Sequence, residues 1–266
     1  MTNVYKFIYR SIWIIVFILA ISSIVFTAMS SKYGFDIYNL INIILFYTVV
    51  IVFSSYRPLL AAKSGKLTNI TEGKLYHLLE KAFILCNIKN PKFNLYIRTR
   101  SNSSKQIANA GVQGFFNYSI IIDQATIDLL NEEELLAILY HEIGHIIGKD
   151  DLYKTLSLLG IVFIPSLSYV IFRSLMLQKL LLNILAIITS IIIILGLLFI
   201  LHLFRDREYK SDLFACQKGN PKALANALIK ISLSNNEPLR TSMFRELFST
   251  HPNTYKRLYR IEKYRE

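Results

Sequence analysis

The sequence predicts a mostly helical α+β protein with four transmembrane helices in two hairpins and a cytoplasmic domain that contains a small antiparallel sheet. The chain of 266 residues is 53% hydrophobic and only 18% charged, with a mean hydropathy of +0.40. Its apolar residues gather in four long runs that are almost free of charge. The polar remainder combines helical periodicity with short strand-like runs, which indicates a mixed domain outside the membrane.

The four apolar runs are each about long enough to cross a hydrocarbon core of ~30 Å as a helix, which takes roughly 17–25 residues. The first is expected to be a retained anchor, because no clear cleavage site follows it. The third is the weakest span, since it is short and contains Pro165, and a buried core helix is its alternative. The runs are Ser11–Met29, Ile37–Tyr56, Leu156–Phe172 and Leu180–Phe204.

The runs divide the chain into two membrane hairpins and two polar regions. Because each hairpin returns the chain to the side it came from, both polar regions are expected on one face of the membrane. Most Lys and Arg residues beside the spans lie on that face, so the positive-inside rule predicts that it is cytoplasmic. The hairpins are residues 1–60 and 156–204, and the polar regions are residues 61–155 and 205–266.

The net charge of +12 fits basic residues that lie beside the membrane spans and face the lipid bilayer. No nucleic-acid partner is expected. Juxtamembrane Lys and Arg are attracted to an anionic leaflet by about 1 kcal/mol each. The C-terminal stretch "YKRLYRIEKYRE" has an RNA-binding strip as its alternative, but a solvated or membrane-facing helix is favoured. Cys86 and Cys216 are the only cysteines, so no disulfide framework is indicated, as expected on a reducing side of the membrane.

The first polar region is expected to begin with an amphipathic helix over Thr71–Cys86. Three strand-like runs follow, "FNLYIRT", "IANAGV" and "YSIIID", with turn residues between them. A short helix then leads to Asn131, which forms a capping-box start with Glu134. The helix that begins there should end near Gly148. In the second polar region, "RDREYKSDLFACQKG", "KALANALIKIS" and the stretch after Pro252 predict three helices.

The stretch "HEIGH" suits a metal-binding helix. His141 and His145 lie one above the other on one helical face, so both can direct an imidazole nitrogen at one tetrahedral ion such as zinc. Glu142 lies beside them, where a general base can take a proton from a zinc-activated water. The alternative interpretation is a pair of hydrogen-bonded histidines on a packed helix.

A hydrolytic zinc site needs a third protein ligand, and Glu208 is the best candidate. Asp212 follows one turn later and could hold a ligand histidine from behind. The alternative for Glu208 is a surface pair with Arg205, although two stacked carboxylates repel unless a cation lies between them. His251 precedes a proline and is either a plain helix start or a hydrogen-bond donor to an oxyanion.

The motifs "HEIGH", "REYKSD" and "THPNTYKR", in this order and with a membrane hairpin between the first two, resemble those of the HtpX-like membrane proteases and the CAAX prenyl endoproteases. The resemblance covers about residues 60–266 by motif. It implies a zincin-like catalytic domain that binds one Zn²⁺ per chain. Residues 61–155 would then be the catalytic region, and residues 205–266 would supply the third ligand.

The resemblance also implies roles for individual residues. Zinc is expected to be held by His141, His145 and Glu208, with Glu142 as general base and Asp212 supporting the zinc ligands. A second group is expected to contact the substrate or the reaction intermediate. Asn109, Ala110 and Gly111 would bind an extended substrate backbone along an edge strand, and His251 and Arg257 would stabilise the intermediate.

These observations predict an integral membrane zinc endopeptidase whose substrates are membrane proteins or membrane peptides. One alternative is a sensor-transducer protease that cleaves itself or a repressor, although the expected external loops are short. Another is a non-catalytic membrane scaffold with a structural zinc. Glu142 argues against the scaffold, because a structural zinc site needs no base. Two positions depart from the family pattern, which usually has a larger apolar residue at Gly111 and commonly Ala at Ser211.

Overall fold

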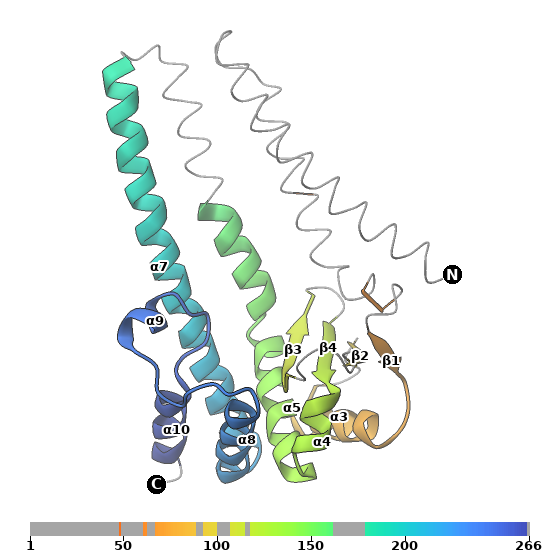
Figure 1. The fold of residues 1–266 in the computed structure, drawn as a ribbon. Coiled ribbons are helices and arrows are strands. Elements are labelled where there is room, and N and C mark those ends of the chain that lie inside the picture. The colour runs from red at the N-terminus through yellow and green to blue at the C-terminus, as the bar shows by residue number, and fades with distance from the viewer. Residues whose placement is uncertain are drawn as a thin grey trace.

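A small sheet and a group of helices form a domain from which one long helix, α7, extends (Figure 1). The computed structural model describes residues 48, 61–62, 67–88, 93–99, 107–114, 118–161 and 179–264. Of the four predicted spans, the first, nearly all of the second and most of the third lie outside the described residues. The fourth lies within α7.

Helix α7 (Lys179–Lys218) contains the predicted span Leu180–Phe204 and continues without a break into the domain. Within the described residues, it is the only helix that is long and apolar enough to cross a membrane. Its apolar side chains are open to the surroundings, with Ile187 and Ile192 63% and 60% exposed. Such a long apolar surface is costly in water and is the normal surface of a helix in lipid.

The sheet has four strands in the order β1-β2-β4-β3. Strand β2 pairs with β4 in parallel, whereas β1 with β2 and β3 with β4 pair antiparallel, so the prediction of an antiparallel sheet is wrong and the sheet is mixed. The reason is burial: β4 is buried along almost its whole length and takes the centre, while the half-buried β3 takes the edge. The strands are β1 (Thr68–Ile70), β2 (Phe93–Arg98), β3 (Ala110–Gln113) and β4 (Tyr118–Asp123).

The predicted helices of the polar regions are all present. Asn131 and Glu134 form the predicted capping box, with the Asn131 side chain accepting from the Glu134 N–H at 2.9 Å and the Glu134 carboxylate from the Asn131 N–H at 3.0 Å. The helices are α3 (Lys74–Leu85), α4 (Gln124–Leu129), α5 (Glu132–Ile147), α8 (Pro221–Ser234), α9 (Met243–Leu247) and α10 (Thr254–Lys263). Residues 150–161 are also helical.

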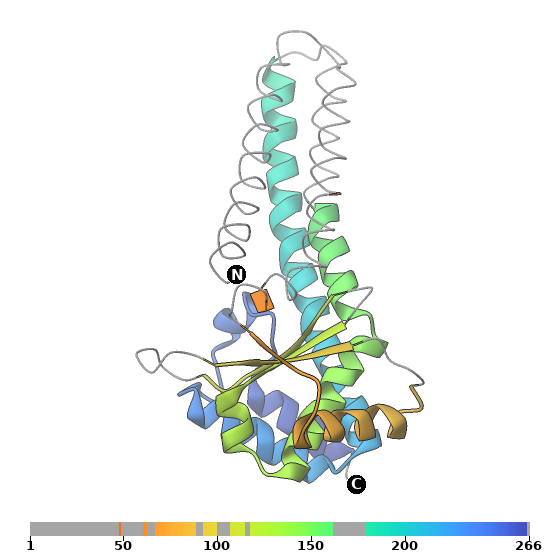
Figure 2. The ribbon, with the colours of Figure 1, turned by 90° about the vertical axis from the view of Figure 1, so that its right-hand side faces the viewer.

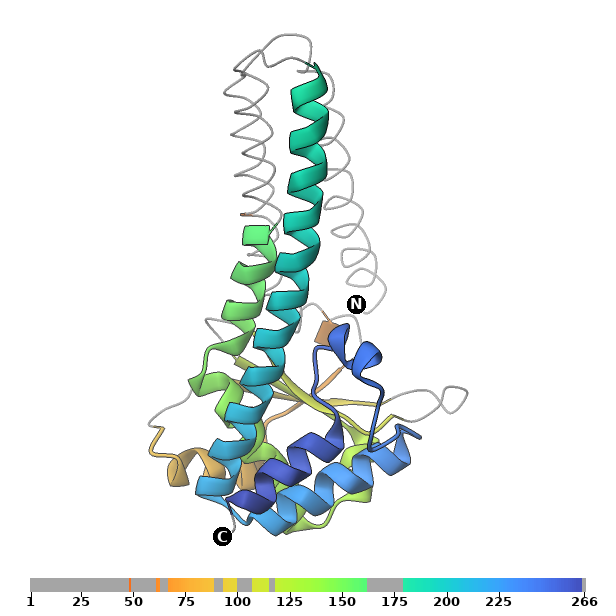
Figure 3. The ribbon, with the colours of Figure 1, turned by 90° about the vertical axis from the view of Figure 1, so that its left-hand side faces the viewer.

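Helix α5 lies at the centre of the domain, where it packs against α3, α7, α8 and β3. Its Leu139 and Ile143 are fully buried among apolar residues of the sheet and of α3 and α8. Figure 2 shows the crossing strands above α3, and Figure 3 shows α8 and α10 side by side below α9. The core therefore fixes α5 between the sheet on one side and α7 and α8 on the other.

Candidate active site

Helices α5 and α7 lie close together at Gly144, the glycine of "HEIGH". A Cβ atom at this position would lie 3.0 Å from Ser211 Cα and 3.2 Å from Ser211 Cβ. A larger residue would therefore push the two helices apart. This close approach brings the α5 side chains His141 and His145 next to Glu208 of α7.

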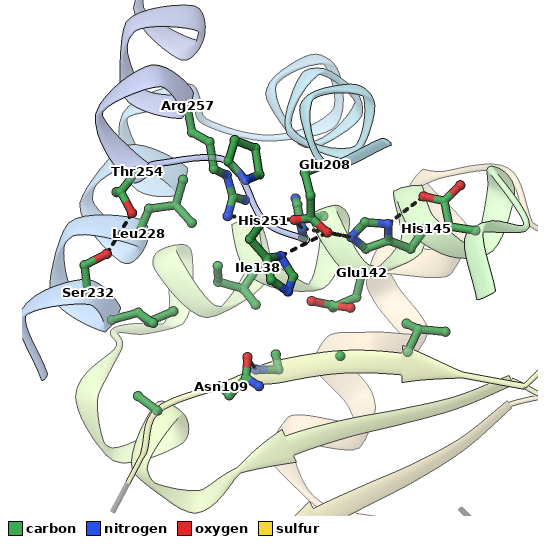
Figure 4. Close-up of a pocket in the computed structure, with 18 of the residues that line it drawn as sticks. Asn109, Ile138, Glu142, His145, Glu208, Leu228, Ser232, His251, Thr254 and Arg257 are labelled. Atoms are coloured by element: carbon green, nitrogen blue, oxygen red, sulfur yellow. Dashed lines mark hydrogen bonds and ion pairs between the residues drawn. The ribbon is translucent and has the colours of Figure 1, made fainter. Parts of the chain in front are cut away.

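His141, His145 and Glu208 form a compact cluster (Figure 4). The Nε2 atoms of the two histidines are 3.1 Å apart, and the Glu208 oxygens lie 3.6 Å from His141 Nε2 and 3.5 Å from His145 Nε2. The donor atoms all lie within 4.8 Å of one another. Zinc binds such nitrogen and oxygen donors at about 2.0–2.2 Å, so a small shift of the side chains would accommodate one ion.

The charges behind the cluster favour an ionised carboxylate at its centre. Burial alone would raise the pKa of Glu208, but His141 and His251 outweigh it and hold this pKa well below its usual range. Burial likewise opposes protonation of His141, yet Asp212 and Glu208 raise its pKa to about 9. Without an ion, the cluster therefore pairs a charged histidine with a charged carboxylate.

Asp212 and Arg257 contact members of the cluster from outside it. Asp212 Oδ1 lies 2.9 Å from His141 Nδ1. Burial would raise the pKa of Asp212, but the Arg257 guanidinium, followed by His141, lowers it to about 2. Arg257 Nη1 also lies 3.9 Å from Glu208 Oε2. Asp212 is thus held as a carboxylate against the ring nitrogen of His141 that faces away from the cluster.

Glu142 is buried, with 5% of its surface exposed, and its Oε2 atom has no hydrogen-bond partner among the residues that the structure describes. Buried carboxylate oxygens are normally hydrogen-bonded, so an unpartnered one indicates a missing water, ion or substrate group. The side chain borders a cavity of about 440 Å³ that His141, His145 and Glu208 also line. Figure 4 shows the Glu142 carboxylate in the space between this cluster and the strand that carries Asn109. A water molecule in this space could contact both Glu142 and the cluster.

Residues 69–265 match the profile of peptidase family M48. The chain belongs to peptidase family M48. Over 218 residues it is 29% identical to a protease HtpX homolog of Pyrococcus abyssi, which covers 71% of this chain and 73% of that protein. Over 232 residues it is 26% identical to a CAAX prenyl protease 1 homolog of Arabidopsis thaliana, covering 82% of this chain and 54% of that protein.

The fold of this M48 protein resembles that of Ste24p from S. mikatae, for which a crystal structure is known. The TM-score is 0.65 at 18% sequence identity, and the match covers 94% of this chain and 66% of the other. The comparisons confirm the resemblance to HtpX-like and CAAX proteases that the three motifs indicated. The matched region includes both α5 and α7, and therefore every member of the cluster.

The structure places the other predicted residues of this M48 protein around the same cavity. Asn109, Ala110 and Gly111 line it at the edge of the sheet, and His251 and Arg257 also line it, with Asn109 and Arg257 on opposite sides in Figure 4. His251 Nδ1 is 3.2 Å from Glu208 Oε1, so His251 is more than a helix start. The alternative pairing of Glu208 with Arg205 is wrong, because Arg205 instead donates to the carbonyl oxygens of α9 and the turn after it.

Two side chains that contact His145 were not predicted. Asp150 Oδ2 lies 2.7 Å from His145 Nδ1, and Ser211 Oγ lies 3.0 Å from the same atom. Asp150 reaches back because Lys149 adopts a left-handed conformation with φ of 52°, which turns the chain at the end of α5. Arg207 donates to Asp150 Oδ1 at 3.1 Å and holds it there. The sequence signal was an acidic residue three positions after the end of α5 and five positions after His145.

Proposed function

We propose that this M48 protein is a membrane-embedded zinc endopeptidase that hydrolyses peptide bonds of membrane proteins or membrane peptides. The observation that carries the proposal is the convergence of His141, His145 and Glu208 beside the unpartnered carboxylate oxygen of Glu142. The relatives that carry protease names support the reaction class. The apolar and exposed first half of α7 supports residence in a membrane.

One Zn²⁺ per chain fits the donor set. Two imidazole nitrogens and a carboxylate are a common set of ligands in hydrolytic zinc sites, which keep a fourth position open. The side of the cluster that borders the cavity supplies this open position. When bound, zinc polarises a substrate carbonyl and lowers the pKa of a water molecule to about 7.

The residues around the ion have separate roles in proton transfer and in stabilising charge. Glu142 accepts a proton from the attacking water with its unpartnered oxygen and passes it to the leaving amine. His251, with a side chain that is 65% exposed, can turn from Glu208 towards the oxyanion of the substrate and donate a hydrogen bond. Arg257 adds positive charge behind the site while it remains bonded to Asp212.

Strand β3 offers a template for the substrate. Its outer edge, where Ala110 lies between Asn109 and Gly111, borders the same cavity as Glu142. An extended peptide that adds to this edge as a further strand presents its carbonyl groups to the cluster. We further propose that the catalytic domain is zincin-like and that it faces the cytoplasm. The chain is proposed to cross the membrane with four helices.

The full chain purified in detergent tests the proposal through its zinc content and its cleavage of casein. Glu142→Gln keeps the shape of the side chain but cannot act as a base, so the variant should retain zinc and lose roughly 10²–10⁴-fold in rate. Glu208→Ala should lower zinc occupancy. A wild-type protein that contains zinc and cleaves casein no faster than Glu142→Gln would contradict the proposal and favour a scaffold with structural zinc.

A further inference from the structure

Strand β3 presents its main-chain groups alternately to β4 and to the cavity. In an antiparallel ladder, every second residue exchanges hydrogen bonds with the partner strand, and the residues between point their N–H and C=O groups away from it. The Asp123 N–H donates to the Asn109 carbonyl at 2.9 Å, and the register continues with Gly111 opposite Ile121. The even-numbered residues from Ala108 to Gly114 therefore face away from β4.

At one end of this edge, the Asn235 side chain binds the outward groups of Ala108. Asn235 Oδ1 accepts from the Ala108 N–H at 2.9 Å, and Asn235 Nδ2 donates to the Ala108 carbonyl at 2.9 Å. Asn235 follows α8, so this contact joins residues that are far apart in the sequence. The side-chain amide occupies both positions that a peptide unit of an added strand would take.

At the other end, Asp151 binds the outward group of Gly114. Asp151 Oδ2 accepts from the Gly114 N–H at 2.7 Å. Gly114 has a φ of +98°, a conformation in which the chain leaves the extended strand. Asp151 lies in the helical residues 150–161, directly after Asp150, which contacts His145. The outward N–H at this end of β3 is therefore occupied by a carboxylate from the helical segment that follows α5.

Between the two ends, Ala110 and Val112 are the outward-facing residues. Within the part of the chain that the structure describes, no side chain or loop bonds the outward N–H and C=O of Val112 or the outward C=O of Ala110. The Ala110 N–H is bonded at 3.0 Å by the side chain of its neighbour Asn109, which can release it to a substrate carbonyl. Both residues line the cavity that contains Glu142.

We infer that Asn235 and Asp151 set the length of substrate that this protease reads, by limiting main-chain pairing to the window from Ala110 to Val112. The inference rests on the proposed function and adds to it a specificity that depends on length. An extended chain rises about 3.4 Å per residue, so the three-residue window spans roughly 10 Å and pairs with a substrate stretch of about three residues. Substrate residues beyond the two closed ends gain no main-chain hydrogen bonds from β3.

A nested series of quenched fluorescent peptides tests this inference on the full chain in detergent. The peptides share one cleavage site and grow by one residue at a time, at the amino end in one set and at the carboxyl end in the other. For the wild type, kcat/KM should rise with length and level off once the peptide extends beyond the stretch of about three residues that pairs with the window. Asn235→Ala exposes two groups of Ala108, so kcat/KM should rise once more at one end of the peptide only, by roughly three- to tenfold.

Asp151→Ala exposes the Gly114 N–H, and the additional rise should then appear at the opposite end of the peptide and be smaller. Asn236→Gly is the matched control, because Asn236 is exposed, has a φ of 56° that glycine adopts freely, and within the described residues bonds through its N–H to Leu233 and not to β3. Its length profile should equal that of the wild type. If Asn235→Ala does not fold, Asp151→Ala carries the test from the other end.

Three results separate the inference from the proposed function. A wild type that contains zinc but cleaves no peptide overturns the proposed function and this inference with it. A wild type that cleaves but shows no levelling with length overturns the inference alone. Levelling that stays at the same length in Asn235→Ala and Asp151→Ala also overturns it, because the two side chains would then hold β3 in place without limiting the substrate.

Discussion

Arg257 donates through Nε and Nη2 to both carboxylate oxygens of Asp212, at 2.8 and 2.6 Å. Arg257 belongs to α10 and Asp212 to α7, so this paired contact joins the C-terminal helix to the helix that carries Glu208. Because Asp212 in turn contacts His141, the orientation of the first motif histidine depends on a residue near the end of the chain. The basic stretch after Pro252 thus contributes a half-buried arginine to the site.

Asp212→Asn should lower zinc affinity roughly 10–100-fold, because the side chain keeps its shape but loses the charge that orients His141. The measurement is competition with a chromophoric chelator on the full chain in detergent. Asp206→Asn is a matched control, since Asp206 lies on the same helix and pairs with Lys210 near the surface. Equal zinc affinities for the two variants would show that Asp212 does not support the ligand.

Asp150→Ala should also lower zinc affinity, since it removes the carboxylate that holds Nδ1 of His145. Asp150→Asn should retain part of the affinity, because its amide oxygen can still accept from the imidazole N–H. Cobalt substitution provides the readout, since its visible spectrum reports the geometry of the ligands. A wild-type cobalt spectrum and affinity in Asp150→Ala would assign the orientation of His145 to Ser211 alone.

Gly144→Ala should destabilise the fold by about 1–3 kcal/mol, because its Cβ would meet the backbone of Ser211 and separate α5 from α7. The same separation should weaken zinc binding, since it moves Glu208 away from the histidines. Gly160→Ala is the matched control in a helix where an added Cβ meets nothing within 4 Å. Thermal unfolding followed by circular dichroism should show a lower midpoint for Gly144→Ala and an equal or higher one for Gly160→Ala.

Stability should depend on pH through Glu134. Burial raises the pKa of Glu134, but the hydrogen bond from Lys230 and the backbone of Asn131 outweigh it and lower this pKa below its usual value. A carboxylate whose pKa is lower in the folded state stabilises the fold above its unfolded pKa, and this contribution disappears as pH falls through the folded pKa. The contribution should therefore be complete near pH 6 and disappear on acidification below about pH 4.5.

Glu134→Gln keeps the capping box but removes the charge, so it isolates this effect. Thermal unfolding of the wild type and of Glu134→Gln should differ by about 0.5–1 kcal/mol near pH 6, and the difference should shrink towards pH 3. Subtracting the two curves removes the contribution of the other carboxylates. A difference that grows on acidification would contradict the sign derived from the Lys230 contact.

The membrane position of α7 can be tested by cysteine labelling in native membranes. Cys86 and Cys216 are buried, which keeps the background low. A cysteine at Ile192 should resist a water-soluble maleimide, whereas one at the exposed Lys222 should react. For a cytoplasmic domain, Lys222→Cys should react only after the membrane is permeabilised. Reaction in intact cells would reverse the predicted orientation, and ready labelling at residue 192 would remove α7 from the membrane.

Local sequence signals predicted the helices well, because their causes lie within a few residues. The capping box at Asn131 and the helical spacing of His141 and His145 are examples. The order of the strands could not be predicted in this way, since β2 and β4 pair across a segment that contains β3. The three-residue strand β1 is too short to leave a pattern in the sequence.

The candidate site was predicted in its main residues and in Asp212, but the contacts of Asp150 and Ser211 with His145 were not predicted. His141, Glu142, His145 and Glu208 were named from spacing and chemistry, and the structure brings them together. The role of Asp150 depends on the positive φ of Lys149, which the residue type alone does not specify. The contacts of Asn235 and Asp151 with the ends of β3 could also not be predicted from the sequence, because they are hydrogen bonds between distant segments.

In the proposed membrane position of α7, the unbroken course of this helix connects the bilayer to the candidate active site. Glu208 follows Phe204 by about one turn of the same helix, a rise of roughly 6 Å. A continuous helix that tilts within the bilayer also tilts outside it. A change in membrane thickness would therefore displace Glu208 relative to the histidines of α5. Under the proposed function, membrane thickness and composition are therefore expected to affect metal affinity.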